Sequence, residues 1–433
     1  MSKSQSILII GGGAFGTSTA YHLALRGYTH VRVLDRYDTP SHDAASTDLN
    51  KIVRADYPDP MYLKMGVEAM EIWKSPTSFL QGLFHQTGWL MAAHELTIGW
   101  LQKAYATAKS LGHGDTRWLS SEDVKRQWPV ITGPMEGWKN VWNSEAGWVP
   151  SSQALVRMAR EAQAEGVVYI TGDDGYVTKL LYDDKNTCVG ALTASGRAHF
   201  ADTVIVSNGS AIPTLVDAKD ESIGTAGCLV VIKLTPAEIE RYKRMPIIDD
   251  MEHGIAFPPD DHGLMKIICN HSITNYAYST VPGASITHSH GDHPYDGIPR
   301  EIEADIRKFL RDILPELAER PWVTTRMCWD CHTKDLHFRI CPYPKARNLY
   351  IATCGAHHGF KFMPIIGRYV VDMLEGKLSE QHARAWSWKS GRGPEAELLD
   401  PHPYQYRDLG ELTGWKDRNR DLAPPSRALR ALL

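Results

Sequence analysis

Two cysteines and a histidine lie close together late in the chain, in the segment TTRMCWDCHTKDLHF at residues 324–338. Cys328 and Cys331 are three positions apart, and His332 follows directly. This spacing occurs in zinc ribbons, in redox-active cysteine pairs and in c-type haem attachment sites. Zinc would need a second pair of ligands, and His332 with Cys341 does not form a familiar one. Two buried free thiols are a further alternative, so the motif alone leaves its chemistry open.

Histidines and an aspartate also gather in THSHGDHP at residues 287–294. His288, His290, Asp292 and His293 follow the H-x-H-x-D-H order of binuclear metal hydrolases. Such a site needs further histidine and aspartate ligands from other loops. The α/β core is committed to a nucleotide, as the next motif indicates. We therefore expect a solvent-facing loop here and no bound metal.

The segment SILIIGGGAFGTSTAYHLALRGYTHVRVLDR at residues 6–36 reads as apolar strand, glycine turn, helix, second strand and acidic end. Gly11, Gly13 and Gly16 form the G-x-G-x-x-G pattern. The first glycine permits the tight turn, the second lets the backbone approach a pyrophosphate, and the third allows close helix–strand packing. Asp35 ends the second strand, where its carboxylate can accept hydrogen bonds from a ribose. The complete context favours a dinucleotide site over an unrelated glycine-rich turn, but it leaves NAD and FAD open.

The rest of the chain indicates how this nucleotide-binding unit is interrupted. An NAD-binding unit would continue into further βα repeats, whereas polar, turn-rich sequence follows at residues 38–60. Strand-like and helix-like segments return near residue 150 and again near residue 346. We expect an α/β nucleotide-binding domain in three pieces, a second domain made by two insertions, and an irregular C-terminal tail. The first domain comprises residues 1–60, 150–216 and 345–390, and the second comprises residues 61–149 and 217–344. The tail comprises residues 391–433.

Composition excludes several classes of protein. The chain has 433 residues, a net charge of −4, 43% hydrophobic residues and 23% charged residues, which is ordinary for a globular protein. No basic patch indicates nucleic acid or an anionic membrane as a partner. The apolar stretch 7–10 is too short to span a bilayer and lacks the flanks of a signal peptide. Seven scattered cysteines fit a reducing compartment, so we expect an intracellular protein.

Taken together, the motifs resemble the fungal fructosyl amino acid oxidases, or amadoriases, of the monomeric sarcosine oxidase family. The resemblance implies a glutathione-reductase-type FAD-binding domain with an inserted α+β substrate domain built on an antiparallel sheet. It also implies oxidation of a secondary amine, with hydride transfer to flavin N5, formation of an imine and reduction of O2 to H2O2. The segments that carry it are the fingerprint through Asp35, DLNKIVR (48–54), EAGW (145–148), VIVSNGSAIPTLV (204–216), GLMKI (263–267), RMCWDC (326–331), ATCGAHHGFKFMPIIGRYVVDMLEG (352–376) and AWSWKSG (385–391).

The resemblance answers the question that the cysteine motif raises. In that family the cysteine of the MCW motif is joined through sulfur to the flavin 8-methyl group, and Cys328 occupies this place, whereas Cys331 does not. The positions that the resemblance and the fingerprint assign to FAD binding are Gly11, Gly13, Ala14, Phe15, Gly16, Asp35, Arg36, Ser46, Asn50, Lys51, Val177, Gly209, Cys328, Gly355, His358, Gly359 and Lys361.

Three residues are candidates for catalysis by the same resemblance. Lys266 enters an apolar strand, and the family lysine at this place lies above the flavin and activates O2, since a fixed positive charge favours formation of an anion. Without the resemblance, Lys266 would read as a strand-end lysine that reaches solvent. Asn50 and Lys51 would lie against the flavin ring and polarise it. A turn or helix cap is the alternative for Asn50, and a surface charge for Lys51.

Four positions are expected to contact the substrate. Lys361 resembles the family lysine that meets a substrate carboxylate. Asn270 follows Cys269 where amadoriases carry an acidic pair, Trp89 replaces an arginine, and His357 replaces a serine. We therefore expect a more neutral and aromatic substrate mouth than in amadoriases. An N-alkyl amino acid or a similar secondary amine is at least as plausible a substrate as a fructosyl amino acid.

Two alternatives to this oxidase are an authentic fructosyl amino acid oxidase and a flavin amine dehydrogenase with another electron acceptor. An FAD-binding protein without catalysis is a third. We expect a monomer that binds a small secondary amine and O2, and neither nucleic acid nor a membrane. The compartment is expected to be the cytoplasm or the peroxisome, although residues 431–433 do not form an S-K-L-type peroxisomal tripeptide.

Overall fold

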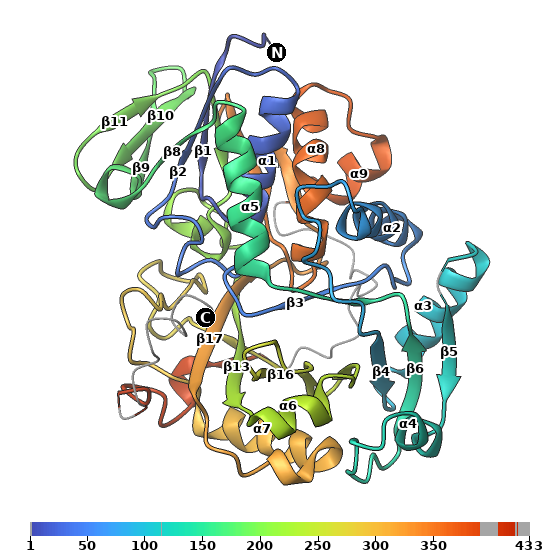
Figure 1. Ribbon diagram of the computed structural model, residues 1–433. Helices are drawn as coiled ribbons and strands as arrows, with labels where there is room; N and C mark the ends of the chain where they lie inside the picture. Colours follow the sequence, from blue (N-terminus) through green and yellow to red (C-terminus); the bar gives the residue numbers. More distant parts are fainter. Residues whose placement is uncertain (1, 114, 390–405, 421, 423–433) are drawn as a thin grey trace.

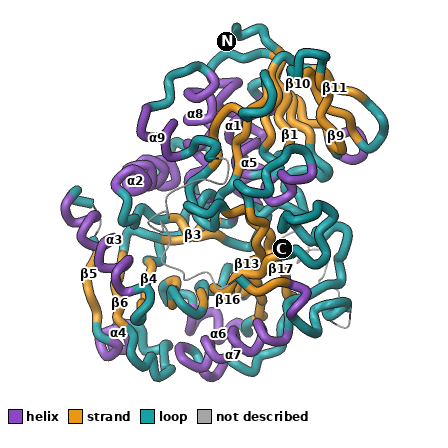
Figure 2. Tube along the Cα trace, turned by 180° about the vertical axis from the view of Figure 1, so that it is seen from behind, coloured by secondary structure: helices purple, strands orange, loops and turns teal. Residues whose placement is uncertain are grey.

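The computed structural model describes residues 2–113, 115–389, 406–420 and 422. Two lobes lie one above the other in Figure 1, the upper one built around β1 (Ser6–Ile10) and the lower one around β13 (Ile223–Lys233), β16 (Leu264–Thr274) and β17 (Thr324–His332). Figure 2 shows the same division from behind, with β3 (Lys51–Val53) between the lobes. The chain crosses between the lobes several times, so each lobe contains segments that are far apart in sequence.

The upper lobe is organised by a six-stranded sheet with the order β18-β19-β12-β1-β2-β8. Its strands are parallel except β18, which pairs antiparallel with β19 at one edge. The bounds are β1 Ser6–Ile10, β2 His30–Leu34, β8 Val168–Ile170, β12 Thr203–Val206, β18 Arg339–Pro342 and β19 Leu349–Thr353. The hairpin of β18 and β19 crosses the domain boundary expected at residue 345, so β18 belongs by its pairing to this sheet. The remaining domain boundaries stay predictions.

Both faces of this sheet are covered, as the uninterrupted apolar sequence of β1 requires. Ile7 and Ile9 pack with helices α1, α5 and α8, while Leu8 and Ile10 pack against a small antiparallel sheet. These elements are α1 Ala14–Leu25, α5 Ser151–Ala164, α8 Met363–Leu374, β9 Val177–Tyr182, β10 Cys188–Thr193 and β11 Ala198–Phe200.

The lower lobe is a nine-stranded, mostly antiparallel sheet with the order β17-β13-β16-β15-β14-β4-β6-β5, to which β20 adds beside β16. The bounds are β4 Trp89–Ala93, β5 Thr116–Leu119, β6 Lys139–Asn143, β13 Ile223–Lys233, β14 Ile247–Asp250, β15 Gly254–Ala256, β16 Leu264–Thr274, β17 Thr324–His332 and β20 Arg407–Asp408. Together the two sheets confirm the predicted fold class, an α/β domain with a second domain built on an antiparallel sheet.

Helices pack against the outer face of the lower sheet. The amphipathic helix α7, Arg300–Ile313, buries Ile302, Ile306 and Phe309, which recur at the helical period. The other helices and the short ribbon between the lobes are α2 Pro60–Lys74, α3 Ile98–Ser110, α4 Ser121–Gln127, α6 Pro236–Tyr242, α9 Glu380–Ala385, β3 Lys51–Val53 and β7 Gly147–Val149.

The C-terminal tail is only partly described. Residues 390–405, 421 and 423–433 of the segment expected to be irregular lie outside the described residues. Its described part is not wholly irregular, because Arg407 and Asp408 pair with Ile273 and Thr274 as strand β20. The main chain of this segment thereby satisfies hydrogen bonds at the free edge near the end of β16.

Helices α1 and α8 approach so closely that one glycine is required between them. A Cβ atom built on Gly367 would lie 2.0 Å from the carbonyl oxygen of Ser18. We expect Gly367→Ala to lower the free energy of unfolding by about 1–3 kcal/mol, because backbone must move to admit the methyl group. Denaturant titration measures this change. Gly99→Ala in α3 is the control: its Cβ meets nothing within 4 Å, and equal losses in the two variants would contradict the packing argument.

Candidate active site

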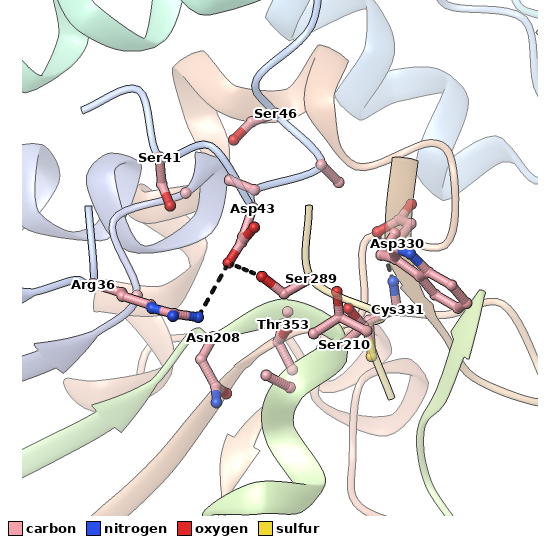
Figure 3. Close-up of a pocket in the computed structure, with 18 of the residues that line it drawn as sticks. Arg36, Ser41, Asp43, Ser46, Asn208, Ser210, Ser289, Asp330, Cys331 and Thr353 are labelled. Atoms are coloured by element: carbon pink, nitrogen blue, oxygen red, sulfur yellow. Dashed lines mark hydrogen bonds and ion pairs between the residues drawn. The ribbon is translucent and has the colours of Figure 1, made fainter. Parts of the chain in front are cut away.

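A cavity of about 630 Å³ lies where the two lobes meet. Its walls include the turn after β1, the loops after β2, β12 and β19, and strand β17. The carboxyl ends of β1, β12 and β19 therefore open into it, which is where open α/β sheets bind ligands. Figure 3 shows side chains from both lobes around this cavity. Among the predicted site residues, the lining includes Gly11, Gly13, Ala14, Phe15, Asp35, Arg36, Ser46, Lys51, Val177, Gly209, Cys328, Gly355, His357 and Gly359.

The other predicted FAD-binding positions support this wall from behind. A Cβ on Gly16 would lie 1.8 Å from the carbonyl oxygen of Gly11, so this glycine lets α1 start directly over the turn. Asn50 is fully buried. His358 Nδ1 lies 3.1 Å from the Tyr57 hydroxyl, which also accepts a hydrogen bond of 3.0 Å from Lys361 Nζ.

Asp35 is held against the glycine turn, as the fingerprint predicts. Its Oδ2 accepts a hydrogen bond of 2.7 Å from the Gly12 N–H, and its Oδ1 accepts one of 3.0 Å from the Tyr37 N–H. Burial raises the pKa of Asp35, while these two donors act in the opposite direction by stabilising the carboxylate. The turn thus fixes an acceptor beside the place where the fold binds a ribose.

Arg36 joins the rim of the cavity to a segment of the lower lobe. Arg36 Nη1 donates to Asp292 Oδ2 at 2.9 Å and lies 3.8 Å from Asp43 Oδ2. The Ser289 hydroxyl donates to the same Asp43 oxygen at 2.7 Å, and Figure 3 shows both side chains directed at Asp43. The sequence analysis missed Asp43 and Ser289, because nothing local indicates that positions 246 apart will meet.

The segment at residues 287–294 is a loop whose residues 291–294 are exposed, as expected, but part of it also lines the cavity. Its aspartate points away from two of its histidines, which stay together. His288 Nε2 lies 2.9 Å from Asp296 Oδ2, and His293 stacks on His288 with ring centroids 3.9 Å apart, whereas Asp292 faces the arginine at the rim. The ligand atoms of His288, His293 and Asp296 lie within 4.8 Å of one another. The absence of a bound metal stays a prediction.

Several buried polar atoms near the cavity test whether it fits a polar cofactor. Five of these atoms have no hydrogen-bond partner within the described part of the chain. They are Nδ2 and Oδ1 of Asn50, the hydroxyl oxygens of Ser46 and Ser207, and Oδ1 of Asn208. A buried polar group without a partner costs about 1–3 kcal/mol. Ser46, Ser207 and Asn208 line the cavity. These groups fit FAD, which offers phosphate, ribityl and ring donors and acceptors.

A buried ion cluster stands beside the cavity, and it contains two of the predicted catalytic residues. Lys266 Nζ lies 2.7 Å from Asp48 Oδ2, and Lys51 Nζ lies 2.8 Å from the same oxygen. Lys266 also donates to the backbone carbonyl of Asn50 and lies 4.4 Å from the centroid of the Phe257 ring. The sequence analysis did not assign Asp48, although it is the first residue of the DLNKIVR motif.

The charges of this cluster are strongly coupled. Burial lowers the pKa of Lys266 to about 8, although Asp48 opposes this decrease. Burial acts against the charged forms of Asp48 and Lys51. Even so, Lys266 and Lys51 hold the pKa of Asp48 well below its usual range, and Asp48 in turn raises the pKa of Lys51. Asp48 is therefore a carboxylate shared by two ammonium groups, and the cluster carries one uncompensated positive charge.

Cys328 stands next to this charge on the cavity wall. Its Sγ lies 4.0 Å from Lys51 Nζ and 3.7 Å from the carbonyl oxygen of Ala45. Cys331 also lines the cavity, but its Sγ lies 3.4 Å from that of Cys354. The geometry thus places the two cysteines of the C-x-x-C motif in different surroundings.

The predicted substrate residue Lys361 lies near an arginine that the sequence analysis missed. Lys361 Nζ bonds the Tyr57 hydroxyl, and the guanidinium carbon of Arg54 lies 4.7 Å from the Tyr57 ring and 4.4 Å from the Trp89 ring. Arg54 is the last residue of the DLNKIVR motif, and the structure makes it a candidate because it is buried, which is unusual for an arginine.

Two buried aspartates lie beside Trp89 and Asn270, and the more neutral and aromatic substrate mouth expected from the sequence stays a prediction. Trp89 Nε1 donates to Asp249 Oδ2 at 3.1 Å, and Asn270 Nδ2 donates to the Asp250 carbonyl oxygen at 2.8 Å. Asp249 and Asp250 come from β14, so pairing between strands returns acidic residues to a region where β16 has lost them. The two consecutive aspartates after an apolar run were the signal in the sequence.

A family model described as FAD dependent oxidoreductase matches residues 6–373. The chain belongs to this family. L-Saccharopine oxidase of Schizosaccharomyces pombe is 31% identical over 411 residues, which cover 89% of this chain and 93% of that protein. Monomeric sarcosine oxidase of Bacillus sp. strain NS-129 is 23% identical over 383 residues, or 86% and 93% of the two chains. The structure of fructosyl peptide oxidase from E. terrenum superposes with a TM-score of 0.88 at 32% identity, covering 96% and 99%.

These comparisons confirm the predicted resemblance to the amadoriase branch of the sarcosine oxidase family. They also confirm the enzyme class: this FAD dependent oxidoreductase is a flavin-dependent amine oxidase that acts on CH–NH donors and forms H2O2. In the part of the chain that the structure describes, no helix is long and apolar enough to cross a membrane.

The cluster predicts a pH-dependent reaction with O2. Because the pKa of Lys266 is about 8, its positive charge is lost as the pH rises through this value, and we expect reoxidation of the flavin by O2 to slow over the same range. Lys266→Met is expected to slow reoxidation at least about tenfold, equivalent to about 1.4 kcal/mol, and to remove this pH dependence. Stopped-flow mixing of the reduced enzyme with O2 measures the rate.

Lys233→Met provides the matched control, because Lys233 lies on the adjacent strand β13 but is exposed. It should leave both the rate and its pH dependence unchanged. A Lys266→Met enzyme that reoxidises as fast as the wild type at pH 7 would remove Lys266 from the reaction with O2.

Proposed function

We propose that this oxidase acts on the secondary amine of an N-substituted amino acid, that Cys328 holds FAD covalently, and that Lys266 promotes the reaction with O2. The observation that carries the proposal is the buried Lys266–Asp48–Lys51 cluster beside Cys328 on the wall of the cavity. A buried ammonium group is costly, so its position next to a redox cofactor supports a chemical role.

When bound, FAD would accept two electrons from the amine and transfer these electrons to O2. The chain's own groups then divide the remaining tasks. The unpaired amide of Asn50 and the ammonium of Lys51 would hydrogen-bond the flavin ring, and Asp48 would keep both lysines in place. The positive charge of Lys266 favours electron transfer to O2, because the product of that transfer is an anion.

The substrate carboxylate is assigned to Arg54 and Lys361. Both cations are buried and flank the Tyr57 ring. A guanidinium with a nearby ammonium is a typical carboxylate site, since charge-assisted hydrogen bonds are the strong ones. Burial near these groups would favour the neutral amine over its ammonium form, which is the form that can be oxidised.

The relatives indicate the class of substrate but differ in its size. Saccharopine, sarcosine and fructosyl peptides, named in the relatives above, share an amine nitrogen that carries a substituent beside a carboxylate or peptide group. We propose an amino acid with a substituent larger than methyl, because the relatives named for saccharopine and fructosyl peptides are 31% and 32% identical to this chain, whereas the one named for sarcosine is 23% identical. The monomeric state and the compartment stay predictions.

The substrate class is tested by anaerobic titration with N-substituted amino acids, among them saccharopine and sarcosine, and with the same amines lacking the carboxylate. We expect flavin bleaching only with the carboxylates and stoichiometric H2O2 on admission of air. Arg54→Gln should raise the substrate concentration that bleaches half of the flavin about 10–100-fold. This factor corresponds to the loss of a charge-assisted hydrogen bond, which contributes about 1.5–3 kcal/mol. Arg117→Gln, on the exposed strand β5, is the control.

Bleaching that does not depend on the carboxylate would contradict the Arg54 and Lys361 assignment. Bleaching without peroxide in air would indicate a dehydrogenase that uses another acceptor. Bleaching by no amine of the series would contradict the proposed substrate class.

The covalent link makes a prediction that needs no substrate. After acid precipitation, we expect the yellow colour to stay with the wild-type protein and a tryptic peptide containing Cys328 to carry the flavin mass, because a C–S bond survives unfolding. Cys328→Ala should release its flavin on denaturation, and Cys331→Ala should retain it. Flavin that leaves the wild type, or that maps to Cys331 or Cys354, would overturn the assignment.

A further inference from the structure

Cys331 and Cys354 form a pair of thiols that the amine oxidation does not use. Their sulfur atoms are 3.4 Å apart, and both side chains are 1% exposed. Cys331 lies near the end of β17, and Cys354 directly follows β19. The pair therefore connects the lower sheet to the upper one, at the place where the two lobes meet around the cavity.

Backbone contacts hold these two segments in position. The Ala356 N–H donates to the Cys331 carbonyl oxygen at 3.0 Å, and the His357 N–H donates to Asp330 Oδ2 at 2.7 Å. Cys354 has a φ of +65°, in the left-handed region that non-glycine residues seldom adopt. The sulfur atoms thus face each other across a fixed junction, and a disulfide of about 2.05 Å needs them to approach by about 1.4 Å.

Only one member of the pair reaches the cavity. Cys331 belongs to its wall, as Figure 3 shows, whereas Cys354 lies behind it. The oxidase forms H2O2 from O2, and peroxide released into this cavity meets Cys331 on its wall. Of the two thiols of this pair, Cys331 is therefore the one that contacts the product first.

We propose that Cys331 and Cys354 are a modification site, at which the enzyme's own H2O2 forms a reversible disulfide. In the first step the Cys331 sulfur attacks one peroxide oxygen, the O–O bond breaks, and Cys331 becomes a sulfenic acid while water leaves. In the second step the Cys354 sulfur displaces the hydroxyl group, which leaves as a second water as the S–S bond forms. Two thiols and one H2O2 thus give one disulfide and two H2O, and the proposal rests on the oxidase function for its oxidant.

The surroundings make this reaction selective for peroxide that is made in place. The hydrogen bond to Cys354, together with burial, raises the pKa of Cys331 well above its ordinary value. A protonated thiol reacts slowly with dilute peroxide. Oxidation therefore needs a high peroxide concentration, which turnover in the adjoining cavity supplies locally and which an excess of added H2O2 can reproduce.

The disulfide would join two walls of the cavity. β17 carries Cys328, and the loop after Cys354 carries Gly355 and Gly359 on the cavity wall. A bond between Cys331 and Cys354 would fix the distance between these walls, and thiol reductants would release it.

The first experiment exposes the folded holoenzyme to added H2O2 and maps thiols by alkylation and peptide mass spectrometry. We expect the peptides of Cys331 and Cys354 to be cross-linked with the loss of two hydrogen atoms, and dithiothreitol to reverse this. In Cys354→Ser, dimedone should trap a sulfenic acid at Cys331, whereas in Cys331→Ser it should not label Cys354. Cys188→Ser, a buried cysteine in β10, is the control and should cross-link as the wild type does.

The second experiment replaces added peroxide by turnover of an amine substrate in air. The same cross-link is expected, without added peroxide. H2O2 production without the cross-link in either experiment overturns this inference and leaves the oxidase function intact. A cross-link with added peroxide, but no amine that generates peroxide, supports the site and contradicts the proposed function. Dimedone labelling of Cys354 in Cys331→Ser would overturn the order of the two steps.

Discussion

One carboxylate shared by two buried lysines is the interaction on which the two lobes and the site depend. Asp48 comes from the loop that follows β2 in the upper lobe, and Lys266 comes from β16 in the lower sheet. Their contact ties the sheets together at the edge of the cavity. Because a second lysine, Lys51, shares the same oxygen, the cluster holds more positive than negative charge in a place from which water is excluded. Such an excess is costly, and a bound cofactor or substrate that gains negative charge would compensate for it.

The strands explain why Lys266 can occupy this position. Side chains alternate along β16, so Met265 and Ile267 enter the core beneath the lower sheet while Lys266 points the other way, beside the surface formed by Leu264 and Ile268. The same alternation on β17 brings Cys328 to that surface. Two neighbours of the central strand β13 thus place a thiol on the cavity wall and a buried cation behind it, where Lys266 contacts the wall residue Asp48.

Sequence reasoning predicted best what is local. The glycine turn and Asp35 follow from contiguous residues whose strand, turn and helix fix each other's positions. Lys266, Lys51 and Cys328 were assigned only through resemblance, since no spacing along the chain indicates that they converge. Asp48, Arg54, Asp43 and Ser289 were missed or left unassigned. Their roles arise from pairing between distant strands and from contacts between the lobes, which the sequence alone does not specify. The acidic residue beside Asn270 could not be predicted from the sequence for the same reason. Asp249, which lies on another strand, accepts a hydrogen bond from the Asn270 side chain.

The crystal structure of the FAD-bound protein tests the central claim most directly. The account predicts continuous density between Cys328 Sγ and the flavin 8-methyl group. It also predicts the ring within hydrogen-bonding reach of Lys51 and Asn50, and Lys266 facing the ring while still paired with Asp48. A flavin ring bound elsewhere in the cavity, or Lys266 turned away to solvent with its contact to Asp48 broken, would contradict it.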